Sequence, residues 1–430
     1  MVSGTLLELV DLAFVGSLGT FALAGVGLGG FIAFVYVSLF FGLGNAVIAT
    51  ASRQVGAGEP EGAGAYLNAA LGVVVLGGVG TAVPLVAGSE FLFRLMNDDP
   101  AVLEAGVPYL SWLLATGPLF GASIAFGQAW NALGKPRFFM VTSIVQNLLN
   151  IPFNYVFIFG WGEWLPAFGA TGAGIGTFAA SVVGLGVHLV LAWAYGGPYG
   201  FLRVRPRSYQ AAELLRLGLP SGFREMIGSI ALALNYRIVG LVGTPELAVY
   251  AILMRFVSFV GLPAFALGTA GASLVGRSLG AAEPEEAHRW GLDTVKVGVL
   301  VMVVLGVPLW LAPRSVISVF VHDPQTIELA IAPVAILGVM IGLNGVSYMM
   351  SAILSGAGDV RRVLYVNLAT NYGLLIPLGY TVGVVLGYGL IGMWVVHQFL
   401  FRASEAGIYL WMWRGRKWVS AFRMRDVPDA

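Results

Sequence analysis

Long apolar runs dominate the chain, and short polar stretches separate them. Each run has about 18 residues or more, enough for an α-helix to cross a hydrocarbon core of about 30 Å. The runs cover residues 1–18, 22–51, 63–88, 105–132, 138–160, 171–196, 214–241, 247–274, 290–312, 328–354, 363–386 and 388–413. The pattern predicts an all-α polytopic membrane protein with twelve transmembrane helices.

The composition agrees with a membrane protein and excludes several other classes. Of the 430 residues, 58% are hydrophobic and 10% are charged, and the mean hydropathy is +0.84. A soluble protein of this length needs more charges than that to cover its surface. The net charge of +1 argues against nucleic-acid binding. The absence of cysteine from the sequence excludes disulfides, thiolate metal sites and cysteine nucleophiles.

The basic residues lie mostly on one side of the predicted membrane helices. Of the 23 lysines and arginines, sixteen fall in the loops and tail of one side, and two, Arg94 and Arg314, fall on the other. Positively charged loops stay in the cytoplasm. We therefore expect both termini to be cytoplasmic in a multi-pass plasma-membrane protein, which is the inner membrane in a Gram-negative cell.

The chain repeats itself at an offset of 224 residues. The segment VGSLGTFALA at 15–24 returns as VGLVGTPELA at 239–248, and RQVGAGEPEGA at 53–63 returns as RSLGAAEPEEA at 277–287. Each half holds six predicted helices, so the halves share their orientation in the membrane. This is typical of two lobes related by a pseudo-two-fold axis along the membrane normal, with the substrate path between them.

The repeat divides the chain into parts. The N-lobe covers residues 1–196, a cytoplasmic linker 197–213, the C-lobe 214–413 and a cytoplasmic tail 414–430. The start of the seventh helix has no counterpart in the first, because that counterpart would precede Met1. We therefore expect a first helix shortened at its N-terminal end by about ten residues, and a native product that begins upstream of Met1.

Two acidic residues lie inside the first apolar run. An ionisable residue within a membrane helix is costly and indicates a functional site. Asp11 is therefore the foremost candidate, because burial favours the protonated form of a carboxyl group and so suits it to proton exchange. Glu8 lies three residues earlier, on the same helix face, where two carboxyl groups would titrate as a pair. The alternatives are a structural salt bridge for Asp11 and a solvated position for Glu8.

The repeated motifs resemble those of the multidrug and toxic compound extrusion (MATE) transporters. The motifs that carry the resemblance are VDLAFVG at 10–16, LGT at 18–20, ALA at 22–24, RQVGAGEP at 53–60, ALGKPR at 132–137 and the loop at 354–361. Their order, spacing and duplication are specific together. The resemblance implies a fold of two six-helix lobes that form a V, and export of organic cations and other amphiphiles against inward H⁺ or Na⁺ flow.

The resemblance also implies where the coupling ion binds. The ion site of the N-lobe centres on Asp11, with partners that match Asn150, Asn154 and Thr177. Several family members have an aspartate where this chain has Asn154, which weakens the case for Na⁺. If Na⁺ were the ion, its ligands would come from these four residues.

The residues themselves support part of this assignment. Asn150 and Asn154 share one helix face, and Pro152 between them interrupts backbone hydrogen bonding and frees carbonyl oxygens, so it is a candidate hinge. The alternative for the asparagines is that they only join neighbouring helices.

The C-lobe has candidate polar residues of its own. The resemblance matches Glu225 and Arg255 to charged residues of some family members. A Glu225–Arg255 pair would either line the substrate cavity or only hold two helices together. Met254 would give that cavity an adaptable apolar wall.

We therefore expect a secondary active antiporter that exports amphiphilic, preferentially cationic drugs or metabolites by alternating access. The coupling ion is H⁺ or Na⁺, and H⁺ is favoured. No enzyme activity, catalytic residue, cofactor or structural metal site is expected, and the partners are a small-molecule substrate and the lipid bilayer, around a monomer. The alternatives are a lipid-linked saccharide flippase of the same superfamily, and a membrane protein that transports nothing.

Overall fold

The computed structural model describes residues 14–319, 323–416 and 418–419 of the chain. The regular secondary structure of this part is helical, apart from one isolated bridge between Trp161 and Leu165. Nine of the helical segments in the described ranges are long and apolar enough to cross a membrane. Large apolar side chains such as Leu76, Val190 and Trp193 are exposed along them, as expected of helices that face lipid.

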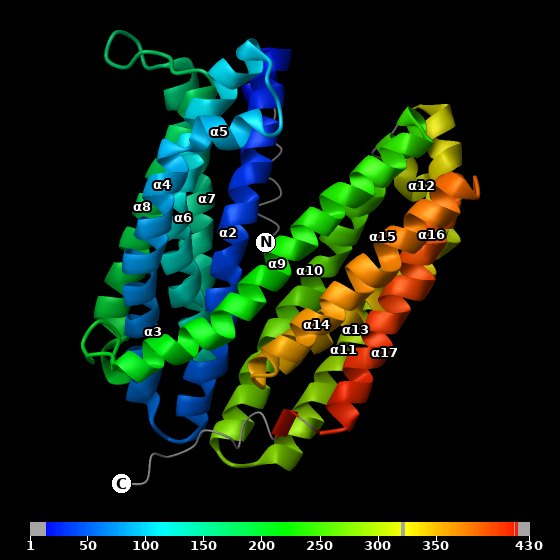
Figure 1. Ribbon diagram of the computed structural model, residues 1–430. Coiled ribbons are helices and arrows are strands. Elements are labelled where there is room, and N and C mark those ends of the chain that lie inside the picture. The colour runs from blue at the N-terminus through cyan, green and yellow to red at the C-terminus, as the bar shows by residue number, and fades with distance from the viewer. Residues whose placement is uncertain (1–13, 320–322, 417, 420–430) are drawn as a thin grey trace. The chain divides into compact units, whose positions relative to one another are not determined.

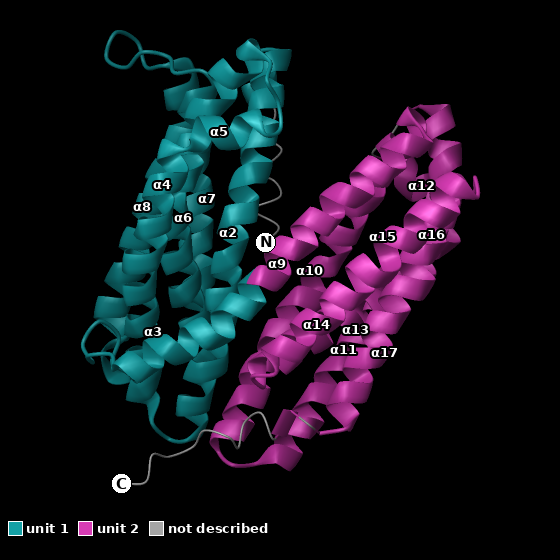
Figure 2. Cartoon of the chain, viewed as in Figure 1, with its two compact units in different colours: residues 1–222 teal, residues 223–430 magenta. Residues whose placement is uncertain are grey.

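The chain divides into two compact units (Figure 2), unit 1 up to Gly222 and unit 2 from Phe223 onward. The helices of unit 1 are α2 (Thr20–Gly56), α3 (Pro60–Val73), η1 (Val74–Gly78), α4 (Val79–Ala87), α5 (Ser89–Arg94), α6 (Pro100–Ala132), α7 (Pro136–Phe159), α8 (Ala170–Tyr195) and η2 (Gly197–Tyr199) (Figure 1). The boundary between the units falls inside α9 (Ser208–Val242). The first predicted span, 1–18, lies mostly outside the described residues.

The remaining helices belong to unit 2. They are α10 (Thr244–Gly280), α11 (Pro284–Leu311), α12 (Pro313–Ser318), α13 (Pro324–Gly356), α14 (Val360–Thr370), η3 (Asn371–Leu375), α15 (Ile376–Tyr380), η4 (Thr381–Val385), α16 (Gly389–Val395), η5 (Val396–Arg402) and α17 (Ala403–Arg414). The segments η3, η4 and η5 are π-helical turns that interrupt the last two spans.

The repeat in the sequence is also a repeat in the structure. The helices α2, α5 and α6 have counterparts of equal length in α10, α12 and α13, and each begins 224 residues later. Gly58 before α3 adopts a left-handed backbone conformation with φ +80°, and so does its counterpart Ala282 with φ 60°. A non-glycine residue is rare in this conformation, so the turn geometry is retained where the glycine is not.

The segment between α8 and α9 is held firmly against unit 1. The Asn68 side chain donates to the backbone oxygens of Gly200 and Val204 at 3.1 and 2.7 Å and accepts from the Leu202 N–H at 2.9 Å. Phe201 is fully buried, with its ring 4.7 Å from that of Trp130. The helix α9 begins at Ser208, so part of the segment predicted as linker, 197–213, is helical.

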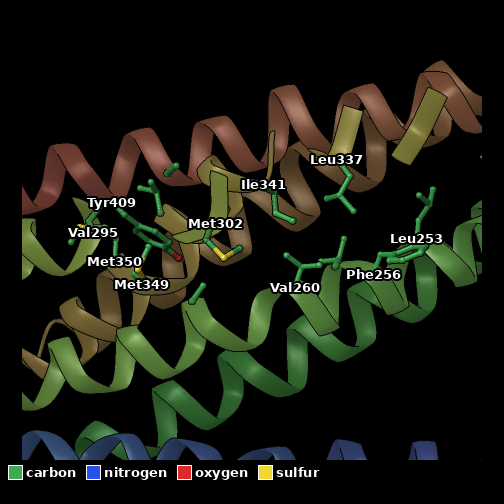
Figure 3. Close-up of a cluster of buried hydrophobic side chains, with 14 of the residues drawn as sticks. Leu253, Phe256, Val260, Val295, Met302, Leu337, Ile341, Met349, Met350 and Tyr409 are labelled. Carbon is green, nitrogen blue, oxygen red and sulfur yellow. The ribbon is translucent and has the colours of Figure 1, made fainter. Parts of the chain in front are cut away.

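Glycines bring the helices of each unit into backbone contact. A Cβ atom on Gly42 of α2 would lie 2.1 Å from the backbone nitrogen of Gly222, and one on Gly306 of α11 would lie 2.4 Å from the Gly338 oxygen of α13. Small residues allow such approaches between membrane helices. The apolar core of unit 2 lies among α10, α11, α13 and α17, and buried side chains such as Leu253, Met302 and Ile341 are spread along it (Figure 3).

Candidate functional site

A chain of hydrogen bonds joins α7 to α8 inside unit 1. The Asn154 amide nitrogen donates to the Asn150 side-chain oxygen at 2.8 Å, and the Asn150 amide nitrogen lies 3.4 Å from the Thr177 hydroxyl. Asn150 and Asn154 are buried, and Thr177 is partly buried. The structure thus brings together the three described residues that the sequence predicted for the coupling site.

The side chains of Asn150, Asn154 and Thr177 form a polar stripe between α7 and α8. This stripe continues beyond the predicted residues. Gln146 lies one turn before Asn150, and its amide nitrogen donates to the Ser181 hydroxyl at 3.2 Å. Ser181 in turn donates to the backbone oxygen of Thr177 at 2.8 Å. Sequence analysis missed Gln146 and Ser181, although both continue the i, i+4 spacing of the stripe on their helices.

Glycines of α8 make room for this stripe. A Cβ atom on Gly176 would lie 2.0 Å from the Asn154 side-chain oxygen, and one on Gly184 would lie 2.7 Å from that of Gln146. Both would clash with the polar side chains of α7. The glycines therefore let amide side chains lie between two closely packed membrane helices, where a larger residue would push them out.

The structure shows no break in α7 at the predicted hinge, Pro152, and it does not describe the two predicted acidic residues. Pro152 is exposed, and α7 continues through it from Pro136 to Phe159. Because proline has no N–H, the Leu148 carbonyl loses its helical partner there. The two acidic residues predicted for the site, Glu8 and Asp11, lie outside the described residues.

Unit 2 has a partly buried ion pair, Arg224–Glu225, instead of the predicted Glu225–Arg255 pair. Glu225 pairs with its neighbour Arg224 and not with Arg255, so the predicted Glu225–Arg255 pair is wrong. The Arg224 guanidinium also donates to the hydroxyls of Ser351 at 2.8 Å and Ser355 at 3.3 Å. These hydroxyls lie one turn apart on α13, so they draw Arg224 toward that helix.

The other two residues predicted for the C-lobe lie outside this ion pair. Arg255 is exposed and forms no ion pair with any described residue. Met254 is partly buried and packs against the apolar core of unit 2.

A second ion pair lies close to the first. The Arg402 guanidinium donates to the Glu405 carboxylate at 2.9 Å and to the Tyr348 hydroxyl at 3.0 Å. The two side chains are only 13% and 5% exposed. Glu405 also lies within hydrogen-bond reach of Tyr409 at 3.4 Å and Asn367 at 3.5 Å. Both charges are therefore neutralised within the unit.

Arg402 lies at an irregular point of its membrane helix. Arg402 ends the π-helical turn η5, and its backbone oxygen accepts from the Ser347 hydroxyl at 3.3 Å. Such turns often mark functional positions in membrane helices and elsewhere. The sequence shows the i, i+3 charges within an apolar run, but not Tyr348 of α13 and Asn367 of α14, which converge on them from other helices.

A buried histidine in unit 1 belongs to neither network. The His188 side chain is fully buried, and neither ring nitrogen has a hydrogen-bond partner among the described residues. Its ring lies parallel to Phe126 with centroids 5.2 Å apart, and near Phe139 at 6.2 Å. These contacts are those of an aromatic core residue.

Comparisons with known proteins agree with this architecture. The MatE family model matches residues 1–156 and 220–381, which is well over half of the chain and covers both halves of the repeat. The relative named Probable multidrug resistance protein NorM, from Thermotoga maritima, is 25% identical over 410 residues, covering 93% of this chain and 86% of its own. Multidrug resistance protein NorM of Burkholderia vietnamiensis is 27% identical over 403 residues, covering 90% and 85%.

Solved structures show the same fold. An outward-facing multidrug resistance MATE family transporter of the MOP superfamily superposes with a TM-score of 0.88 at 22% identity, over 99% of this chain and 94% of its own. A MATE structure in the straight conformation gives a TM-score of 0.87 at 22% identity, over 98% and 94%. With the family model matched in both halves, the chain belongs to the multidrug and toxic compound extrusion (MATE) family of membrane transporters.

Proposed function

We propose that this protein is a secondary active antiporter that exports amphiphilic, preferentially cationic compounds in exchange for H⁺. In this proposal it works as a monomer in the plasma membrane, by alternating access, with both termini in the cytoplasm and no cofactor besides the coupling ion. The relatives named multidrug resistance protein NorM support the export of drugs. The observation that carries the proposal is the polar stripe of Asn150, Asn154 and Thr177 between two membrane helices.

Asp11 would supply the charge that the stripe itself lacks. Ionised Asp11 would favour the state that binds a cationic substrate, and its protonation from outside would remove that preference. An ion or substrate shifts such an equilibrium only by its different affinity for the two states. In this proposal the amides of Asn150 and Asn154 contribute to this difference, because they can donate to a carboxylate and accept from a carboxylic acid.

The neutral side chains of the stripe favour H⁺ over Na⁺ as the coupling ion. Asn150, Asn154 and Thr177 offer a sodium ion only uncharged oxygen ligands. A sodium ion needs several oxygen ligands, and a second carboxylate would help to hold its charge. A proton needs a single carboxyl group, which Asp11 provides.

The charges of the chain favour a cationic cargo over an anionic one. Arg224 and Arg402 are each paired with a glutamate. An anionic pyrophosphate cargo, as in a lipid-linked saccharide flippase, would need several cations that are free to meet it, and only Arg237 and Arg255 of unit 2's membrane arginines form no ion pair with a described residue. The acidic residues of the first span, Glu8 and Asp11, suit a cationic cargo instead, so we favour the exporter of cations.

Transport in proteoliposomes tests this proposal. Efflux of a fluorescent lipophilic cation is measured with a pH gradient alone, a sodium gradient alone and neither, against vesicles with no protein. The proposal predicts efflux with the pH gradient, and none with sodium alone. Efflux driven by sodium alone, and lost in potassium, would overturn the choice of ion. No efflux of any cation under either gradient would overturn the exporter itself.

A further inference from the structure

The connection between α7 and α8 is longer than the fold requires. In unit 1 it covers residues 160–169, whereas the connection between the matching helices of unit 2 covers only 386–388. Three residues are therefore enough to join such helices. The extra residues form a separate structure of their own, which projects from the helix ends of unit 1 (Figure 1).

This added segment is a small closed hairpin. The Trp161 N–H donates to the Leu165 oxygen at 2.9 Å, and the Trp164 N–H donates to the Trp161 oxygen at 3.2 Å. Gly160 and Gly162 have positive φ angles of 83° and 57°, which a glycine adopts without strain. The tip of the hairpin is thus closed by its own backbone hydrogen bonds.

The hairpin presents two largely exposed tryptophans. The Trp161 and Trp164 side chains are 61% and 91% exposed, and neither forms a ring contact or a side-chain hydrogen bond with any described residue. Phe168 beside them is 40% exposed. Glu163 is the one charged residue in the loop sequence GWGEWLPAFG. Water alone is a poor environment for so much aromatic surface.

The length of α7 indicates which layer of the membrane surrounds the hairpin. The helix α7 begins beside Lys135 and Arg137, so the hairpin lies at the end away from these basic residues. At 1.5 Å per residue, the 24 residues of α7 span about 36 Å. That length exceeds a hydrocarbon core of about 30 Å and falls short of the full bilayer of about 40–45 Å. The chain therefore leaves α7 at the level of the lipid headgroups.

We propose that this tryptophan hairpin, residues 160–169, is a membrane anchor that lies in the headgroup layer of the bilayer. Tryptophan prefers this layer, because its ring is apolar and its indole N–H finds polar partners there. The base of the hairpin is tied to α7, since the N–H groups of Phe168 and Gly169 donate to the backbone oxygens of Phe157 and Ile158 at 3.0 and 3.1 Å. The anchor thus fixes the depth of the two helices that carry the Asn150–Thr177 stripe.

A spin label on the hairpin tests the anchor directly. Because the sequence has no cysteine, Trp164→Cys gives a single labelling site in the full chain. In nanodiscs that hold one copy each, power saturation compares collisions with oxygen, which enters lipid, and with a water-soluble nickel chelate. The matched control is Asp98→Cys, an exposed position in the loop before α6, at the same end of unit 1. We expect oxygen to dominate at position 164 and nickel at position 98. Equal nickel access at both positions would overturn the anchor.

A second experiment asks whether the tryptophans themselves hold the hairpin in the lipid. A label at Ala167→Cys, an exposed position in the same loop, should be shielded from nickel in the parent chain. Trp161→Ser with Trp164→Ser should expose it, and the two phenylalanine replacements should retain most of the shielding. A label that stays shielded in the serine variant would contradict the proposal. So would shielding that appears only when several copies share one vesicle, because a second copy would then be the partner.

Discussion

Asp99 and Asp323 occupy equivalent places in the two halves of the chain, and each caps the N-terminus of a 33-residue helix. The Asp99 carboxylate accepts from the Ala101 N–H at 2.9 Å, and the Asp323 carboxylate accepts from the Thr326 N–H at 2.8 Å. A proline follows each aspartate at the first helical position, where its missing N–H costs nothing. The repeat thus preserves a capping device as well as a helix length.

Removing the cap at Asp323 should destabilise unit 2. Asp323→Ala leaves the first N–H groups of α13 without a side-chain acceptor, so we expect a lower Tm at neutral pH. Asp323→Asn retains an acceptor and should stay close to the parent. Thermal unfolding of the purified protein, followed by size-exclusion chromatography after heating, measures both. Equal Tm values for the alanine variant and the parent would contradict the role of the cap.

The same cap should depend on pH. The side-chain hydroxyl and the backbone N–H of Thr326 donate to Asp323 and hold the pKa of its carboxyl group below the usual value. A group with a lowered folded pKa stabilises the protein above its unfolded pKa, and this stabilisation is lost as the pH falls through the folded pKa. The Tm difference between the parent and Asp323→Ala should therefore be present at neutral pH and shrink in acid. A difference that grows in acid would contradict the assignment.

Asp11→Asn should abolish coupled export and leave a folded, inserted protein. The proposed mechanism needs a group at this position that gains and loses a proton, and an amide cannot do so. Export under a pH gradient is measured in proteoliposomes, with expression and the elution profile as the check on folding. Normal export by a well-expressed Asp11→Asn variant would show that another residue couples the ion.

The polar stripe of α7 should matter for coupling. We expect Asn154→Leu to lower export by about tenfold or more, since loss of a coupling free energy on the order of 1–3 kcal/mol has that effect. Asn154→Asp should instead make export respond to sodium, because it adds a charged oxygen ligand. Leu148→Ala is the matched control, since Leu148 lies on the same helix and is 64% exposed. Similar losses in the Leu148 and Asn154 variants would point to a disturbed helix rather than to coupling.

Replacing only one residue of the buried Arg402–Glu405 pair should lower the stability of the protein strongly. Removing one partner of a buried pair leaves an uncompensated charge and typically costs about 3–5 kcal/mol. We expect Arg402→Met and Glu405→Gln each to destabilise the protein strongly, and the double variant to be less destabilised than their sum. The control is Lys296→Met, because the Lys296–Asp293 pair is exposed and such pairs contribute about 0–1 kcal/mol. Additive losses in the double variant would show that the two charges do not interact.

His188 should be replaceable by phenylalanine. Neither of its ring nitrogens has a hydrogen-bond partner among the described residues, and its ring stacks on Phe126. Phenylalanine retains the stacking and has no polar atom to bury. Export and Tm of His188→Phe should match the parent, whereas His188→Ala should lower the Tm by leaving a cavity. A His188→Phe protein that folds but does not export would identify the imidazole as a part of the proton path.

The sequence alone predicted the helical membrane class, the positions of the spans and the duplication. Local sequence patterns determine these features. An apolar run long enough to cross a bilayer forms a helix whatever it packs against, because its backbone must form its hydrogen bonds within the run. The spacing of Asn150, Asn154 and Thr177 likewise indicated one shared site, since i, i+4 positions share a helix face and the family resemblance supplied the neighbouring helix.

The tertiary structure decided which polar groups surround the charged residues of unit 2. Neither Tyr348 nor Asn367 is near Glu405 in the sequence, and the choice of Arg224 as the partner of Glu225 depends on the serines of α13. Helix register and rotation place these groups, and both are set by glycine contacts and π-helical turns that no local pattern specifies. A contact between distant helices depends on packing across the whole unit, and this is why the sequence shows the neighbouring charges but not the polar groups that reach them from other helices.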